Sequence, residues 1–305
     1  MSEQTVKKKI KKQWTREKKK DFCFDMIFGI IIILVCLSCL LPFIHVFSKS
    51  ISEDAYVIAN KVLLLPKGFS LEAYRRIMAD SSILRSLYVT VVVTLSFTAI
   101  GLFVTICSAY ALSRKHLKGK AVFTFLFMLT MYFNAGIIPD YLMMSNLNFL
   151  DTWWSLILPL TFSAYNFLIM KSFFQHSISD SLIESAFIDG ATHFTILAKI
   201  VLPLSKPILA TIALFFAVGR WNAYQDALFY IKQRQDLRPL QLKLYYLIIS
   251  ATESLQAEGG FGGTVTNPEV IKAASVIFAT LPILLIYPFL QKYFVQGTMI
   301  GAVKE

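Results

Sequence analysis

Six long apolar stretches, separated by polar segments, dominate the pattern along the chain. Each is long enough for a helix, which rises 1.5 Å per residue, to cross the hydrocarbon core of a bilayer. We therefore predict an all-α, polytopic membrane protein with about six transmembrane helices. The predicted spans cover about residues 24–47, 83–112, 121–144, 152–174, 208–231 and 270–294.

The third and fourth stretches each contain a proline. Pro139 lies inside the third stretch and Pro159 inside the fourth. Proline lacks a backbone N–H and clashes with the preceding turn, so we expect the third helix to break at Pro139. Broken backbone at membrane depth has to be surrounded by protein or by water.

Composition supports the membrane assignment. The chain of 305 residues is 56% hydrophobic, with a mean hydropathy of +0.59, which is too apolar for a soluble protein of this length. The net charge of +11 would suit a nucleic-acid partner. However, the cations cluster beside the apolar stretches, which favours membrane topology and contact with lipid headgroups, with no nucleic acid involved.

The positions of the cations predict the orientation. Residues 1–22 form a basic tail that precedes the transmembrane domain, residues 23–294, and a short tail, residues 295–305, follows it. Most of the 30 Lys and Arg residues fall on one side if both tails and the segment between the fourth and fifth spans share that side. Because cytoplasmic segments carry the excess of positive charge, we expect both termini to be cytoplasmic. Two long polar segments, 48–82 and 232–266, then lie outside, and the second contains a glycine-rich run at 259–263.

A polar but helical segment separates the fourth and fifth spans, at residues 180–206. Ser181 to Glu184 has the pattern of a capping box that begins a short helix. Gly190 can end this helix, because glycine accepts the left-handed conformation found at helix ends. A second short helix is predicted at 194–201, and Pro203 marks the entrance to the next span. The sequence thus predicts an elbow of two helices.

This elbow resembles the EAA loop of ATP-binding-cassette (ABC) importer permeases. Ser185 replaces the usual middle alanine of the motif. The family pattern of Glu-Ala-Ala, Asp-Gly-Ala and Ile-x-Leu-Pro is matched by Glu184, Ala186, Asp189, Gly190, Ala191, Ile200, Leu202 and Pro203. The resemblance implies a coupling helix that sits in a groove of a cytoplasmic ATPase, with Phe187 and Ile188 as apolar anchors and the two carboxylates organising the elbow. From the local residues alone, an amphipathic connector on the membrane surface is the alternative.

The resemblance extends to nearly the whole chain. Segments 134–159, 219–231 and the tail from Gln291 resemble carbohydrate importer permeases of the maltose-type second subunit, in the subgroup for complex oligosaccharides or polysaccharide fragments. Such proteins belong to the bacterial cytoplasmic membrane. The resemblance implies as partners a second homologous permease, a dimeric ATPase, an extracytoplasmic solute-binding lipoprotein and an oligosaccharide. The C-terminal tail either reaches between the ATPases, as in the maltose-type relatives, or frays.

Catalytic and metal-binding patterns are absent from the sequence. No G-x-x-x-x-G-K-[ST] occurs, so we expect no enzyme and no cofactor in this chain, with ATP and Mg on the partner ATPase. The four His have no metal-ligand spacing. The four Cys lie in or beside apolar stretches and are predicted to be buried thiols.

Polar and aromatic residues gather in the fifth stretch. Sugars are bound by aromatic faces and by polar side chains, and such density within a span favours a cavity over lipid. The substrate candidates are Arg220, Trp221, Asn222, Tyr224 and Gln225, with Asn134, Tyr165 and Asn166 from the third and fourth stretches. Helix–helix hydrogen bonds are the alternative role. Arg220 could pair with a uronic acid or with Asp226, but a separation of six positions disfavours that pair within an ideal helix.

Two other functions remain open. One is a permease of the same fold for another solute, such as an amino acid, a peptide or phosphate. The other is a secondary transporter or channel, which usually carries an internal repeat; no clear repeat relates the two halves.

Overall fold

The computed structural model describes residues 3–257 and 268–302, and these residues are mainly helical. The glycine-rich run at 259–263 and residues 303–305 of the tail lie outside the described residues. The first helices are α1 (Glu3–Ser50), α2 (Asp54–Ile58), α3 (Glu72–Ala79), α4 (Ser81–Ser113), α5 (Lys120–Tyr132), α6 (Ile137–Asn146), α7 (Trp153–Ile157) and α8 (Ala164–Ser177). There follow α9 (Asp180–Ile188), α10 (His193–Ile196), the π-helix η1 (Leu197–Val201), α11 (Leu202–Leu204), α12 (Lys206–Asn222), α13 (Gln225–Tyr230), the 3₁₀-helix η2 (Gln235–Leu237), α14 (Leu240–Ala257) and α15 (Pro268–Ala302).

Three of the predicted spans are continuous helices. Among the described residues, segments of α1, α4 and α15 are long and apolar enough to cross a membrane, and they correspond to the first, second and sixth apolar stretches. The count rises to five if two sharply bent helix pairs are each taken as one span. The predicted all-helical membrane class is therefore confirmed, while some of the predicted spans are interrupted.

The third stretch breaks before its proline. Helices α5 and α6 meet at an angle of 114°, and Gly136 takes a φ of +88° just before α6. Pro139 lies in the first turn of α6, where its missing N–H removes no intrahelical bond. The predicted break exists, but it lies at residues 133–136 and not at Pro139.

The fourth and fifth stretches are not single helices. α7 ends at Ile157 and α8 begins only at Ala164, with Pro159 and a left-handed Leu160, φ +64°, between them. α12 ends at Asn222, and extended backbone at Ala223 separates it from α13. Continuous helices over 152–174 and 208–231 were therefore a wrong prediction, because hydropathy alone does not detect breaks that neighbouring helices stabilise.

The chain forms two compact units, and each is described by itself. One comprises residues 1–74 and 262–277. In it, serines near the end of α1 hold the following loop: Ser48 Oγ donates to the Leu64 carbonyl at 2.6 Å, and Ser50 Oγ lies 2.8 Å from the Tyr74 hydroxyl. Within this unit most apolar side chains in the spanning segment of α1 are exposed, as expected for a surface that meets lipid or other parts of the assembly.

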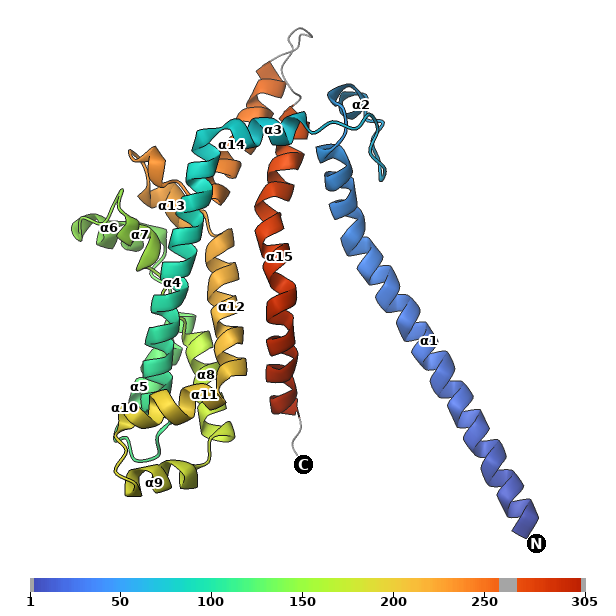
Figure 1. Ribbon diagram of the computed structural model, residues 1–305, viewed down its shortest axis with the longest axis vertical. Coiled ribbons are helices and arrows are strands. Elements are labelled where there is room, and N and C mark those ends of the chain that lie inside the picture. Colours follow the sequence, from blue (N-terminus) through green and yellow to red (C-terminus); the bar gives the residue numbers. More distant parts are fainter. Residues whose placement is uncertain (1–2, 258–267, 303–305) are drawn as a thin grey trace. The chain divides into compact units, whose positions relative to one another are not determined.

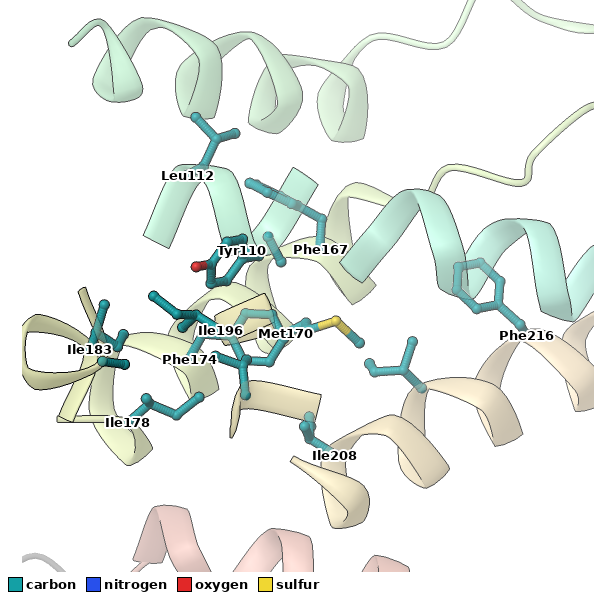
Figure 2. Packing of buried hydrophobic residues seen from close by; sticks show 14 of the residues in the cluster. Tyr110, Leu112, Phe167, Met170, Phe174, Ile178, Ile183, Ile196, Ile208 and Phe216 are labelled. Atoms are coloured by element: carbon teal, nitrogen blue, oxygen red, sulfur yellow. The ribbon is translucent and has the colours of Figure 1, made fainter. Parts of the chain in front are cut away.

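The second unit contains residues 75–261 and 278–305 and has its core around α4. Helices α8 and α12 pack along α4, and Figure 1 shows α9 and α10 at one end of α4 and α13 and α14 at the other. Gly101 allows close packing there, because a Cβ at this position would lie 2.9 Å from the Thr161 carbonyl oxygen. The fully buried side chains Phe167, Met170 and Phe174 form the centre of the core (Figure 2).

The described cysteines are not buried within this chain. Cys36, Cys39 and Cys107 are free and exposed. The prediction of buried thiols is wrong for them, because apolar helix surfaces of a membrane protein can face lipid or another subunit as well as the core.

Candidate coupling elbow and substrate cavity

The first helix of the elbow begins earlier than predicted. Ser179, in extended conformation, caps α9 by accepting the Leu182 N–H at 3.4 Å. Asp180 therefore occupies the first helical position, where its charge suits the helix dipole. Glu184 lies in the second turn and cannot reach the free N–H groups, so the predicted capping box from Ser181 to Glu184 is wrong.

The end of α9 follows the prediction for glycine. Gly190 has a φ of +79°. Its N–H donates to the Phe187 carbonyl at 3.0 Å, and the Ala191 N–H donates to the Ala186 carbonyl at 2.9 Å. These two bonds form a Schellman motif, which satisfies carbonyls that the helix end would leave free.

The two faces of α9 differ in burial. Ile183 and Ala186 are buried in the core around α8, and Ala191 packs against it. On the other side, Ile188 is 86% exposed and Phe187 is 39% exposed. Phe194, at the start of the second arm, is 78% exposed. One face thus anchors the elbow to the core, and an apolar edge remains on the surface of the chain.

Glu184 and Asp189 do not organise the elbow through their side chains. Both are exposed, and neither side chain forms a hydrogen bond or ion pair with the described residues. Asp189 serves as the C-cap through its backbone N–H, which donates to the Ser185 carbonyl at 3.0 Å. This part of the prediction was wrong, since backbone bonds shape the turn.

The C-terminal end of α4 holds the elbow, a connection that sequence reasoning missed. Lys115 Nζ lies 2.5 Å from Asp180 Oδ2, and this contact lowers the pKa of Asp180 and raises that of Lys115. The His193 ring lies 4.8 Å from the Phe187 ring and 6.5 Å from the Tyr110 ring, measured between centroids. One ion pair and two edge-to-face ring contacts thus join the end of α4 to α9 and α10.

The second arm leads into α12 through a sharp bend. Thr192 caps α10 by accepting the Thr195 N–H at 3.3 Å, and a π-helical turn follows at η1. The arm of residues 193–204 meets α12 at 84°. Pro203 is exposed and Leu202 is half-buried next to this bend. Pro207 in the first turn of α12 cannot donate a hydrogen bond back to the arm, which favours the bend at Ser205.

Four of the substrate candidates line one cavity of about 340 Å³. Asn134 comes from the break between α5 and α6, and Asn222, Tyr224 and Gln225 come from the break between α12 and α13. The cavity is also lined by Asp226, which belongs to the polar cluster of the fifth stretch, and by Asp140 and Tyr230, which sequence reasoning did not select. The break after α12, which hydropathy does not predict, places α13 against α6 and brings these residues to the cavity. We call this space the polar cavity.

Arg220 and Asp226 form a buried ion pair beside the polar cavity. The Arg220 Nη1 donates to Asp226 Oδ2, and the Arg220 side chain is 3% exposed. Within one ideal helix a separation of six positions disfavours this pair, but the prediction against it was wrong. The break at Ala223 and Tyr224 brings the two residues together. Arg220 Nη2 and Asp226 Oδ1 remain buried without hydrogen-bond partners among the described residues.

The other candidates lie elsewhere. Trp221 is buried, and its indole N–H donates to the Ala279 carbonyl of α15 at 3.1 Å; it borders a separate apolar cavity of about 420 Å³. Tyr165 is exposed and Asn166 is buried, and neither lines the polar cavity. Helix packing, the alternative role weighed from the sequence, describes Trp221 well.

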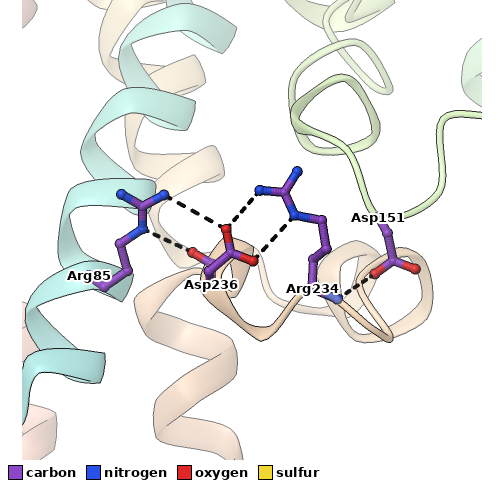
Figure 3. Close-up of polar contacts among 4 residues, drawn as sticks. All are labelled: Arg85, Asp151, Arg234 and Asp236. Carbon is purple, nitrogen blue, oxygen red and sulfur yellow. Dashed lines mark hydrogen bonds and ion pairs between the residues drawn. The ribbon is translucent and has the colours of Figure 1, made fainter.

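Polar contacts tie together the end of α4 opposite the elbow (Figure 3). Asp151 Oδ1 accepts the backbone N–H groups of three successive residues, Lys232, Gln233 and Arg234, at 2.8, 2.8 and 3.1 Å. Burial raises the pKa of Asp151, but these three donors outweigh it and the net shift is downward. Asp236 bonds Arg234 at 2.8 Å and lies 3.8 Å from Arg85 of α4. The segment after α13 is thereby fixed to α4 and to the turn before α7.

Comparison with known families decides the class. Residues 119–300, which contain the elbow and all the lining residues of the polar cavity, match the family described as "Binding-protein-dependent transport system inner membrane component". The chain belongs to this family. The predicted resemblance to ABC importer permeases is confirmed, and the family description agrees with a multi-pass membrane protein.

Individual relatives of this permease extend the match over most of its length. It is 42% identical over 287 residues to the "Polygalacturonan/rhamnogalacturonan transport system permease protein YtcP" of Bacillus subtilis (strain 168), covering 93% of this chain and 99% of that one. It is 32% identical to the "Melibiose/raffinose/stachyose import permease protein MelC" of the same organism, covering 76% and 79%.

A solved structure shows the same fold. It is titled "Crystal structure of a bacterial ABC transporter involved in the import of the acidic polysaccharide alginate", and the TM-score is 0.81 at 33% sequence identity. The match covers 90% of this permease and 98% of that chain. The relatives are transport permeases, consistent with a chain that is not itself an enzyme.

Proposed function

We propose that this permease is one of two membrane subunits of an ATP-driven, receptor-dependent oligosaccharide importer of the bacterial cytoplasmic membrane. Its partners are a second homologous permease, a dimeric ATPase that binds ATP and Mg, and an extracytoplasmic solute-binding lipoprotein. The observation that carries the proposal is the elbow of α9 and α10, which has one face packed into the core and an apolar edge left exposed. The sugar relatives, YtcP and MelC, support the choice of solute.

The elbow transmits motion as a rigid joint. Ile183 and Ala186 fix α9 in the core, and Lys115 joins it to the end of α4. A displacement of the exposed edge therefore moves α4 and α8 with it, because packed helices move as rigid bodies. The ATPase binds the exposed side chains of Phe187 and Ile188. When the ATPase dimer closes on ATP, the permease switches from the inward-facing to the outward-facing state. Both termini and the elbow lie in the cytoplasm.

Substitution of the exposed edge tests this coupling. Ile188→Glu places a charge where the side chain is 86% exposed, so the fold is unaffected while the apolar contact with the ATPase is lost. We expect loss of ATPase co-purification and of uptake. Ile58→Glu, at a 55% exposed isoleucine in α2, is the matched control and keeps both. Retention of the ATPase and normal uptake in Ile188→Glu would refute the role of the elbow.

The polar cavity contacts the oligosaccharide during passage. Asn134, Asn222 and Gln225 offer amide groups that can donate to and accept from sugar hydroxyls, and the Tyr224 ring offers a stacking face. Asn222→Ala and Gln225→Ala should each raise the apparent KM of uptake by roughly tenfold, since each removes a hydrogen bond worth about 1 kcal/mol and leaves its partner unpaired. Tyr165→Phe, outside the cavity, is the control. An unchanged KM in both alanine variants would leave these residues with a packing role.

A further inference from the structure

A second cavity lies at the end of α4 opposite the elbow. It has a volume of about 310 Å³ and is lined by the N-terminal turns of α4 and by the segment from η2 into α14. Its walls carry three cationic side chains, Arg85, Arg238 and Lys243, against a single carboxylate, Asp236. We call it the basic cavity. None of its residues was selected from the sequence, and none belongs to the elbow or to the polar cavity.

The carboxylate of the basic cavity is already engaged. Asp236 Oδ2 lies 2.8 Å from Arg234 Nη2 and 3.8 Å from Arg85 Nη2, and the hydrogen bond from Arg234 lowers its pKa (Figure 3). Arg85 Nε also donates to the Asp236 carbonyl at 3.2 Å. Asp236 is therefore shared between Arg234 and Arg85, and the other two cations of the cavity wall form no ion pair with it.

Within the described part of the chain, the side chains of Arg238 and Lys243 have hydrogen-bond donors that are free to bind a ligand. Arg238 is half-buried with its guanidinium 4.8 Å from the centroid of the Tyr246 ring, and its buried Nε has no hydrogen-bond partner among the described residues. Lys243 forms no ion pair with the described residues. A second carboxylate, Asp80, acts on it electrostatically, but Asp80 is held by the Ser82 N–H at 2.8 Å as the cap of α4. Because this Nε is enclosed, an anionic ligand in the cavity would meet the terminal Nη groups of Arg238 and the Lys243 ammonium, where charge-assisted hydrogen bonds are strong.

We propose that the basic cavity binds the carboxylate of a uronic acid residue and selects acidic oligosaccharides for this importer. This inference rests on the proposed function and names its substrate class. A planar carboxylate matches the fork of Arg238, with Lys243 as the second charge. The volume is at the lower end for small-molecule sites, which suits one end of an oligosaccharide. The segment from Tyr230 to Arg238 contributes residues to both cavities. An oligosaccharide bound in the basic cavity can therefore extend toward the polar cavity.

The test compares one sugar in two charge states. The full importer with its receptor is reconstituted in proteoliposomes, and ATP-dependent uptake is measured as a function of the concentration of trigalacturonate or of its methyl ester, at one fixed receptor concentration. Arg238→Gln and Lys243→Gln should each raise the KM for trigalacturonate about tenfold or more, which is the loss expected for one charge-assisted hydrogen bond. The kcat of uptake and the KM for the methyl ester should stay unchanged. Lys232→Gln removes a cation from the same segment but outside the basic cavity, and it should leave the KM unchanged for both trigalacturonate and its methyl ester.

Several results would overturn the inference. Equal losses for acid and ester would indicate a structural role, and unchanged KM for both would indicate no role. Weaker binding of the sugar-free receptor to Arg238→Gln and Lys243→Gln would assign the cavity to a receptor carboxylate. If the wild-type importer carries the ester but not the acid, this inference fails while the proposed function stands. If it carries neither sugar and its ATPase does not respond to loaded receptor, the proposed function fails as well.

Discussion

Gly190 offers the sharpest test of the elbow, because the structure separates backbone strain from steric fit at this position. Its φ is +79°, and a Cβ built there would meet nothing within 4 Å. A side chain at Gly190 therefore costs only the left-handed conformation, which is about 1–2 kcal/mol for alanine. Asparagine tolerates this conformation far better, and a β-branched residue tolerates it worst.

The series Gly190→Asn, Gly190→Ala and Gly190→Val should thus lose function in that order. A cost of about 1.4 kcal/mol shifts the balance between the closed and opened Schellman turn tenfold. We expect amide exchange at Gly190 and Ala191 to accelerate about tenfold in Gly190→Ala and more in Gly190→Val, measured on the assembled complex. Uptake should fall in parallel, while binding of the loaded receptor stays unchanged.

A control separates this effect from a general intolerance of glycine substitution. Gly29 lies inside α1, and a Cβ there also meets nothing within 4 Å. Gly29→Ala should be neutral or slightly stabilising, because alanine is the better helix former. The reasoning would be refuted if Gly190→Val kept normal exchange and uptake, or if Gly190→Asn were as damaging as Gly190→Val, which would indicate that side-chain size matters and backbone conformation does not.

Three further predictions concern stability. Phe174→Ala removes a fully buried ring of the core and should cost about 3–5 kcal/mol, seen as a large drop in the thermal midpoint in detergent; a drop of only a degree or two would contradict the packing in Figure 2. Trp221→Phe should lower the free energy of unfolding by about 1 kcal/mol, because the hydrogen bond to the Ala279 carbonyl is lost, and should leave the KM of uptake unchanged. A raised KM would instead indicate that Trp221 contacts the substrate. Asp151→Ala should lower stability by about 1 kcal/mol at neutral pH, since three backbone donors lose their acceptor. Because the folded pKa of Asp151 is lowered, its contribution is present above its unfolded value, about 3.9, and is lost as pH falls through the folded value. The wild-type and Asp151→Ala midpoints should therefore converge below about pH 4, and a constant difference down to pH 3 would exclude this origin.

The order of apolar stretches and the glycine of the elbow were readable from the sequence. Hydropathy identifies α1, α4 and α15 because a bilayer demands a minimum apolar length, and that demand is local. The C-terminal end of α9 was predictable for the same reason, since only the residue at position 190 has to accept a positive φ. The start of α9 was misplaced because Ser179 and Ser181 are equally good caps by type, and packing of Ile183 selects between them.

Residue types along the chain predict the membrane class, the elbow and the set of polar residues in the fifth stretch, because each depends on residue type within one turn or one span. Tertiary structure alone decided where the helices break and which polar groups meet. Arg220 reaches Asp226 only because α12 stops at Asn222. Arg85 lines the basic cavity together with Arg238 and Lys243, which lie about 150 positions later in the sequence. The hydrogen bond from Arg85 Nε to the Asp236 carbonyl joins residues equally far apart. Such proximity arises from the packing of α4 against the later segments, and no local pattern encodes it.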